Sequence, residues 1–461
     1  MSQLLETVFE IHCFFCILFS SSNLVDRYLS KISGTSQEHI RQGFALAIAS
    51  LPNEMLLTNG TINKVFDCLF NLISISSQTQ HLIKQRRDTL IALSNLYENI
   101  YQHPRSPFYE EDLSKKYFNG YLRCSRDYTN DRLGDSGRLV RETACSQLVR
   151  LLKLINNHDQ TKHYLTVATL HNCVYAILTN VCSKIDDLRL VSGKAFLEFL
   201  NIEFEKNIDY RDELQKIFHQ QMDIDWRNSQ VVFQLVVQLI NFEKYRFIIW
   251  LHCLMTAGEL NPASQALYNF LTIHKSNTSF IRLLFDDLEK IFSDKQYSQI
   301  RIIIPCVQAC ERLLSQSTFL FYFQTNPNDF FQHWKTILQS LEEIVTKKSQ
   351  LLNNNPTLYL HLIKLKCALL QFSHLELRNL VIRALTKFFL HEYPWVRRQA
   401  AQNFYDTCIM FNEEIFMCNP SNTDDHADDV MNILTETDWE ENLENVTKIR
   451  NNLLNLLDIK E

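Results

Sequence analysis

Apolar residues recur at spacings of three and four along most of the chain, which is the period of an α-helix. One such stripe contains Leu139, Val140, Ala144, Leu148, Leu151 and Leu152, and another contains Val381, Leu385, Phe388 and Phe389. Short polar breaks that contain Pro or Asn separate the stripes, at 51–53, 103–107, 326–328 and 353–356. Such residues end a helix or cap the next one. The pattern predicts helices of about 12–20 residues with tight connections.

Composition supports an all-α fold. The 461 residues include only 8 Gly and 9 Pro, roughly 2% each against averages of about 7% and 5%. Sheet proteins need glycine-rich hairpin turns and nucleotide folds need glycine-rich loops, so this scarcity favours helices joined by short turns. A chain of this length also exceeds one compact core, which stops growing near ~250–300 residues, and therefore divides into domains or grows as a repeat array.

A short motif recurs on some of the predicted helices. Residues 135–144 read Asp-Ser-Gly-Arg-Leu-Val-Arg-Glu-Thr-Ala, and residues 395–400 repeat the Val-Arg-x-x-Ala core. Residues 186–195 give a third copy in which Ser192 stands in place of the Arg, and a looser copy begins at Ile40. This motif is typical of the second helix of a HEAT repeat. We therefore predict an all-α, HEAT/armadillo-type α-solenoid of about ten helix pairs.

The motif has a physical meaning. The Val and Ala are expected to face a neighbouring helix, where a small residue permits close packing. The Arg is expected to reach an Asp or a helix-end carbonyl. We assign this structural role to Asp135, Val140, Arg141, Ala144, Val396 and Ala400.

The two ends of the chain differ from the predicted repeats at 25–412. Residues 1–24 contain an apolar run, 11–19, which no Lys or Arg precedes and which is far shorter than the ~20 residues that span a bilayer. We expect a buried N-terminal helix there and no membrane insertion. Residues 413–461 begin with an acidic stretch, 413–444, that contains no Lys or Arg.

We interpret this last segment as an acidic loop followed by a capping helix. An amphipathic helix is predicted from Trp439 to Leu457, with Trp439 as its largest apolar anchor. A repeat array needs such a cap, because its last repeat otherwise exposes an apolar face.

Charge and candidate chemistry exclude several functions. A formal net charge of −6 disfavours nucleic-acid binding, which depends on a basic face. Cys13-x-x-Cys16 beside His12, and the pair Cys306 and Cys310, lack the partners of a zinc or redox site. No phosphate-binding loop or hydrolase motif is present, so we predict no catalytic residues, no cofactor and no metal. The scattered thiols indicate a reducing compartment.

Exposed aromatic and basic residues remain as candidates for protein binding. We select Trp395, Arg397 and Arg398 as partner-binding candidates. The basic group at 84–87 has two interpretations, namely ion pairing between repeats and contact with an acidic partner.

Several segments resemble the C-terminal part of the tubulin-folding cofactor D family. Their order and spacing fit from about residue 25 to the end. The fullest is 391–405, which reads His-Glu-Tyr-Pro-Trp-Val-Arg-Arg-Gln-Ala-Ala-Gln-Asn-Phe-Tyr. The others lie at 41–52, 127–142, 183–186, 243–247, 434–440 and 449–457.

The resemblance implies a HEAT-repeat chaperone or scaffold of the cytoplasm that binds β-tubulin and assists assembly of the α/β-tubulin heterodimer. It implies tubulin-folding cofactors E and C and an Arf-like small GTPase as partners, and association with microtubules and centrosomes. It also implies stimulation of GTP hydrolysis within a complex, without enzymatic activity of the chain itself. The alternative is a HEAT-repeat scaffold for another client, of the transport or phosphatase-assembly type.

Overall fold

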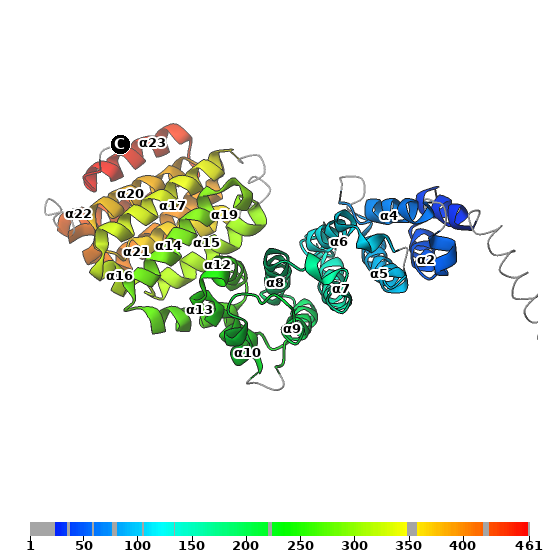
Figure 1. The fold of residues 1–461 in the computed structure, drawn as a ribbon. Coiled ribbons are helices and arrows are strands. Elements are labelled where there is room, and N and C mark those ends of the chain that lie inside the picture. Colours follow the sequence, from blue (N-terminus) through cyan, green and yellow to red (C-terminus); the bar gives the residue numbers. More distant parts are fainter. Residues whose placement is uncertain are drawn as a thin grey trace, which may run out of the picture. The chain divides into compact units, whose positions relative to one another are not determined.

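The computed structural model describes residues 24–34, 37–57, 60–75, 81–103, 106–132, 134–219, 224–347, 357–417 and 424–459. Helices make up most of these ranges, which confirms the predicted all-α, helical-repeat fold (Figure 1). The described part of the chain contains one small hairpin, β1 (Asn130–Asp131) and β2 (Gly134–Asp135), that the sequence analysis did not predict. Residues 1–23, and with them Cys13 and Cys16, lie outside the described ranges.

The chain divides into two compact units, Met1–Asn228 and Ser229–Glu461. Residues 24–34 of the first unit are helical. Its further helices are α2 (Glu38–Ile48), α3 (Asn53–Leu56), α4 (Thr61–Leu72), α5 (Ile83–Ile100), η1 (Pro107–Tyr109), α6 (Glu111–Cys124), α7 (Arg138–Asn156), η2 (Lys162–Tyr164), α8 (Val167–Val181), α9 (Asp186–Leu200) and α10 (Arg211–His219).

The second unit begins with α11 (Ser229–Val236), η3 (Val237–Asn241), α12 (Glu243–Ala257), α13 (Asn261–His274), α14 (Thr278–Ser293), η4 (Lys295–Tyr297), α15 (Ile300–Ser315) and α16 (Leu320–Thr325). It continues with α17 (Pro327–Lys347), α19 (Thr357–Leu369), α20 (Leu375–Thr386), η5 (Lys387–Leu390), α21 (Pro394–Met410), η6 (Glu413–Met417), α22 (Asp424–Glu436) and α23 (Leu443–Leu456). We predicted one continuous array over 25–412, and the division between the units lies inside that range.

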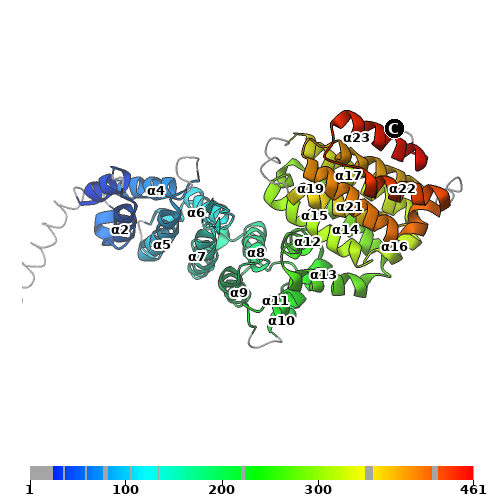
Figure 2. The ribbon, with the colours of Figure 1, turned by 180° about the vertical axis from the view of Figure 1, so that it is seen from behind.

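Within each unit the helices pack in rows. In the first unit α2, α5, α7 and α9 lie side by side, and α4, α6 and α8 pack on α5, α7 and α9. In the second unit α12, α15, α19 and α21 form one row, while α14, α17 and α20 form another (Figure 2). The apolar stripes of the sequence face these contacts, and Val140, Leu148 and Val381 are fully buried. Burial of this kind is the main favourable contribution to folding.

Local sequence signals set several helix starts. The Thr166 hydroxyl accepts a hydrogen bond from the Thr169 amide, and Asn277 accepts one from the amide of Phe280. Each satisfies an amide that has no partner inside the helix. Pro394 begins α21, a position where the missing N–H costs nothing because that amide is unpaired in any helix.

An arginine recurs at one helical position. It is the fourth residue of α2, α5, α7, α9, α12, α20 and α21. The residues at this position are Arg41, Arg86, Arg141, Arg189, Arg246, Arg378 and Arg397. Our alignment of the third motif copy, in which we placed Ser192 at the Arg position, was therefore wrong. Arg189 occupies that position, and Ser192 occupies the position of the small residue, because α9 begins at Asp186.

The end of the chain also differs from the prediction. Much of the acidic stretch is helical, since η6 and α22 lie within it, and the expected loop at 419–423 lies outside the described residues. The last helix begins at Leu443 instead of Trp439, because the Asn442 side chain caps it by accepting a hydrogen bond from the Asn445 amide. Leu443, which a helix beginning at Trp439 would place on the apolar face four residues on, is 45% exposed.

None of the helices in the described ranges is both long and apolar enough to cross a lipid bilayer.

Candidate functional site

The predicted partner-binding residues lie at the start of α21 and differ in exposure. Trp395 is partly exposed and Arg398 is exposed, with its guanidinium 3.0 Å from a carboxylate oxygen of Glu440. Arg397 is buried and points into the fold. Of the three side chains, Trp395 and Arg398 are therefore accessible to a partner.

Three main-chain carbonyls surround the Arg397 guanidinium. Its Nε donates to Trp439 O at 2.6 Å, its Nη1 to His391 O at 2.8 Å and its Nη2 to Glu441 O at 3.2 Å. The first and last of these acceptors belong to the connection between α22 and α23. Arg397 thus joins α21 to the connection that follows the next helix.

Trp439 lies in that connection, before α23. Its side chain is buried, its ring centroid is 4.6 Å from that of Phe389, and its Nε1 donates to Leu434 O at 3.1 Å. A buried indole needs such an acceptor for its N–H. Trp439 therefore packs the connection against η5.

The motif arginine of α7 belongs to a charge network in the first unit, beside buried motif residues. Val140 and Ala144 are buried, as are Val396 and Ala400 of α21. Arg141 makes two hydrogen bonds to the Asp135 carboxylate, at 3.0 and 2.6 Å, and a third to Asp127 O at 2.6 Å. The small hairpin holds Asp135 in place for this contact, and Gly134, the first residue of β2, has a φ of 108°, a conformation open to glycine.

The same network joins α7 to α5, its neighbour in the row of helices. Arg86 of α5 and Asp127 form an ion pair at 2.8 Å with both side chains fully buried. Two members of the basic group at 84–87 therefore form ion pairs within the chain, Arg86 with Asp127 and Arg87 with its neighbour Asp88.

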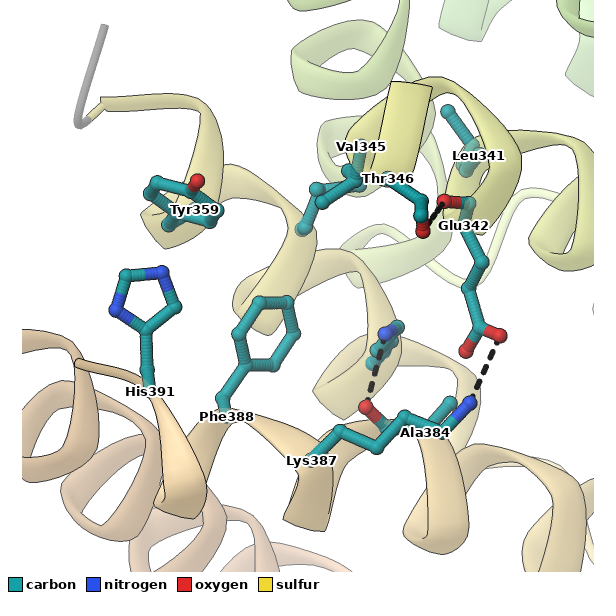
Figure 3. Close-up of a pocket in the computed structure, with 11 residues that line it drawn as sticks. Leu341, Glu342, Val345, Thr346, Tyr359, Ala384, Lys387, Phe388 and His391 are labelled. Atoms are coloured by element: carbon teal, nitrogen blue, oxygen red, sulfur yellow. Dashed lines mark hydrogen bonds and ion pairs between the residues drawn. The ribbon is translucent and has the colours of Figure 1, made fainter. Parts of the chain in front are cut away.

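A cavity of about 230 Å³ opens in the second unit (Figure 3). Helices α17, α19 and α20 contribute to its wall, together with η5 and the residue that follows it. Its lining residues are Leu341, Glu342, Val345, Thr346, Tyr359, Leu362, Lys366, Ala384, Lys387, Phe388 and His391. Most of this wall is apolar or aromatic, and the polar groups are few.

Lys366 is the buried charged residue of this cavity. Its side chain belongs to α19 and is only 5% exposed. The ammonium donates a hydrogen bond to Ala384 O at 3.0 Å and lies 4.5 Å from the Phe388 ring centroid. Burial lowers the pKa of Lys366 to about 8, because desolvation disfavours the charged form.

Three other polar side chains of the cavity, Glu342, Thr346 and Lys387, have partners within it. Lys387 donates to the Glu342 carboxylate at 2.9 Å, and the Thr346 hydroxyl donates to Glu342 O at 2.9 Å (Figure 3). The imidazole of His391 lies with its centroid 4.5 Å from that of Tyr359. Burial lowers the pKa of His391.

The thiols that we weighed for metal or redox chemistry are enclosed where the structure describes them. Cys306 and Cys310 are buried in α15. Burial raises the pKa of Cys310 to about 12 and that of Cys306 well above its usual value, so neither is a thiolate at neutral pH. Over the described residues, no group of three or more His, Cys, Asp or Glu side chains is placed to hold a metal ion.

Lys366 was missed in the sequence analysis, although a signal for it was present. It follows Leu362 by four residues and Ile363 by three, so it lies on the stripe of α19 that faces the protein interior. A lysine on such a stripe is unusual, since lysine is almost never fully buried without a partner.

Comparisons with known proteins agree with the resemblance seen in the sequence. Residues 171–351 match the family described as "Tubulin folding cofactor D C terminal". The chain is 24% identical over 489 residues to "Tubulin-specific chaperone D" of Dictyostelium discoideum, an alignment that covers 95% of this chain. It covers 32% of that relative, so the chain spans about a third of the length of the protein it matches.

Proposed function

We propose that this chain, which is related in sequence to tubulin-folding cofactor D, is a non-catalytic chaperone or scaffold of the tubulin folding pathway. In this proposal it binds β-tubulin and assists assembly of the α/β-tubulin heterodimer. The observation that carries the proposal is the alignment with a tubulin-specific chaperone over 95% of the chain. The order of the matched segments, from about residue 25 to the end, supports it.

The architecture of each unit supports binding over catalysis. Rows of packed helices offer long surfaces to a protein client, as helical-repeat proteins commonly do. The polar groups of the described cavity are largely engaged with one another or with main chain. We therefore propose that the chain contributes binding surface and no chemistry of its own.

The proposal extends to partners and location. Tubulin-folding cofactors E and C and an Arf-like small GTPase are the expected partners, in the cytoplasm and in association with microtubules and centrosomes. Any stimulation of GTP hydrolysis then belongs to the assembled complex and acts on the GTP of a bound protein.

Affinity isolation of the tagged chain from cytosol, followed by mass spectrometry, tests the proposal. β-Tubulin or the other tubulin cofactors should be enriched over importins and phosphatase subunits. A purified mixture of the chain with tubulin then tests direct binding by size-exclusion chromatography. Enrichment of an unrelated client, with no tubulin or cofactor above background, would overturn the proposal in favour of the alternative scaffold.

Surface variants locate the contact in the same assay. Arg398→Glu reverses an exposed charge at the start of α21. Arg383→Glu is the matched control, because it makes the same change at an exposed arginine of α20. Loss of tubulin binding with Arg398→Glu alone assigns the contact to the α21 start, whereas equal binding of both variants removes Arg398 from the candidates.

A further inference from the structure

A buried ammonium group without a carboxylate partner stands out in the second unit. Buried lysines usually form an ion pair, because transfer of a charge out of water is costly. Among the described residues, no carboxylate lies within ion-pair distance of Lys366, and the nearby carboxylate of Glu342 is paired with Lys387. One of three ammonium hydrogens is used, in the bond to Ala384 O. The cavity thus has a cationic floor with unused donors.

We propose that this cavity binds the C-terminal residue of a peptide segment of a partner protein, with the terminal carboxylate on Lys366. The aliphatic side chain of that residue would contact Leu341, Val345 and Phe388. This site goes beyond the proposed tubulin function and does not depend on it. The chemistry that recognises the ligand is one negative charge attached to a small apolar group.

The size of the cavity favours a single residue as its occupant. Pockets that enclose whole cofactors or drug-sized molecules measure about 300–1,000 Å³. The volume here is about 230 Å³, which is enough for one aliphatic residue. Thr346 and Lys387 at the rim are exposed, so the rest of a peptide can continue into solvent.

The charges around Lys366 are compatible with an anion. Glu342 from α17 faces it but is neutralised by Lys387 of η5. The buried thiol of Cys367 adjoins it on α19, and the Tyr359 hydroxyl and His391 imidazole line the same cavity. Because burial lowers the pKa of His391, that ring is neutral at pH 7 and neither attracts nor repels the carboxylate.

A purely structural role for Lys366 is the competing explanation. Ala384 lies in the last turn of α20, where carbonyls lack helical partners and a cation is favourable. That role predicts an effect of Lys366 on stability and none on ligand binding. The two explanations are therefore separable by a binding measurement.

Fluorescence anisotropy of a labelled short peptide that ends in Leu, with the whole chain, provides that measurement. The free-acid peptide should bind. C-terminal amidation should lower the affinity of the peptide for the chain at least about tenfold, because the charge-assisted hydrogen bond is lost. Lys366→Met should have the same effect. Lys364→Met, the same change on the same helix at a residue outside the cavity, should leave the affinity unchanged.

Two further measurements keep the test independent of folding in Lys366→Met. Thr346→Trp places a large ring at the exposed rim and should block the peptide without altering the floor. Raising the pH from 7 to 9 should weaken the wild-type affinity by about tenfold, since Lys366 loses its proton near pH 8.

Equal binding of the free-acid and amidated peptides would overturn the proposal, as would no binding of either. Equal affinity for 4-methylpentanoate, the free acid with the same side chain, would replace the peptide by a small carboxylate as the occupant. Loss of tubulin binding in the cytosol assay with normal peptide binding here would reject the proposed function alone.

Discussion

The Nε of Arg397 donates a hydrogen bond of 2.6 Å to the main-chain oxygen of Trp439, a residue 42 positions further along the chain. Arg189 of the first unit has the same arrangement, with its Nε 3.3 Å from Trp226 O. It also donates to Ser183 O, six residues before it, as Arg397 does to His391 O. Two helices in different units therefore make the same contact, in which an arginine donates both to a carbonyl just before its helix and to a carbonyl of a later connection.

Arg397→Ala should lower the free energy of unfolding by about 1–3 kcal/mol, because three main-chain carbonyls, of which Trp439 O is buried, lose their donor. Arg398→Ala, which removes an exposed ion pair, should change it by less than about 1 kcal/mol. Urea unfolding of both variants measures the difference. Unchanged stability of Arg397→Ala together with lost partner binding would show that Arg397 acts in recognition instead.

Trp439→Ala should cost about 3–5 kcal/mol, since its buried ring leaves a cavity beside Phe389. Trp439→Phe keeps a ring but removes the donor to Leu434 O, so about 1 kcal/mol is expected. Thermal unfolding gives both values. If Trp439→Ala melts like wild type, the connection before α23 does not anchor the end of the second unit.

Gly193→Ala should destabilise the first unit by about 1–3 kcal/mol through overpacking. A Cβ at Gly193 would lie 2.0 Å from a ring carbon of Trp226, closer than two carbons can approach. Gly43→Ala is the matched control in helix α2, where a Cβ meets nothing within 4 Å. The control should stabilise by about 0.5–1 kcal/mol, because alanine favours the helix. Equal melting temperatures of the two variants would contradict the contact between α9 and Trp226.

Lys366→Met should raise stability at pH 7 by about 2 kcal/mol, because it removes a buried unpaired charge. The folded-state pKa, about 8, lies below the ordinary value of 10.5, so the unfolded chain binds more protons between these values. The free energy of unfolding of the wild type therefore increases as pH rises from 8 to 10.5, as far as it depends on Lys366. The difference in stability between Lys366→Met and wild type becomes smaller over the same range. Unfolding at pH 7 and pH 10 tests this, and an advantage that grows with pH would contradict it.

Local features of the sequence were sufficient for the class of fold and for several buried residues. The spacing of apolar residues predicted helices, and the Val-Arg-x-x-Ala motif identified positions such as Val140, Ala144 and Val396, which the structure shows buried. These inferences succeed because a helix presents residues three and four apart on one face. The start of α23 was misplaced although Asn442, a common capping residue, carried the signal for it.

Features that depend on distant segments were not predicted. The cavity around Lys366 combines side chains from Leu341 to His391, and their meeting depends on how three helices pack.

The register of the motif in α9 was also wrong, because Arg189 and Ser192 both fit a helical pattern and only the helix start separates them. The acceptors of Arg397 could not be foreseen either, since a carbonyl is common to every residue.

The use of main-chain carbonyls as acceptors has a consequence for how this protein tolerates mutation. The guanidinium groups of Arg189, Arg378 and Arg397 bind oxygens of the polypeptide backbone, such as Trp226 O, Ile415 O and Glu441 O. An acceptor of this kind survives any replacement of the side chain that carries it. A substitution at an exposed acceptor position such as Glu441 therefore leaves this hydrogen bond intact. A saturation library should show strong selection at the arginine and nearly free variation at an exposed acceptor residue such as Glu441, while the buried acceptor residues Trp226 and Trp439 stay constrained by their own packing.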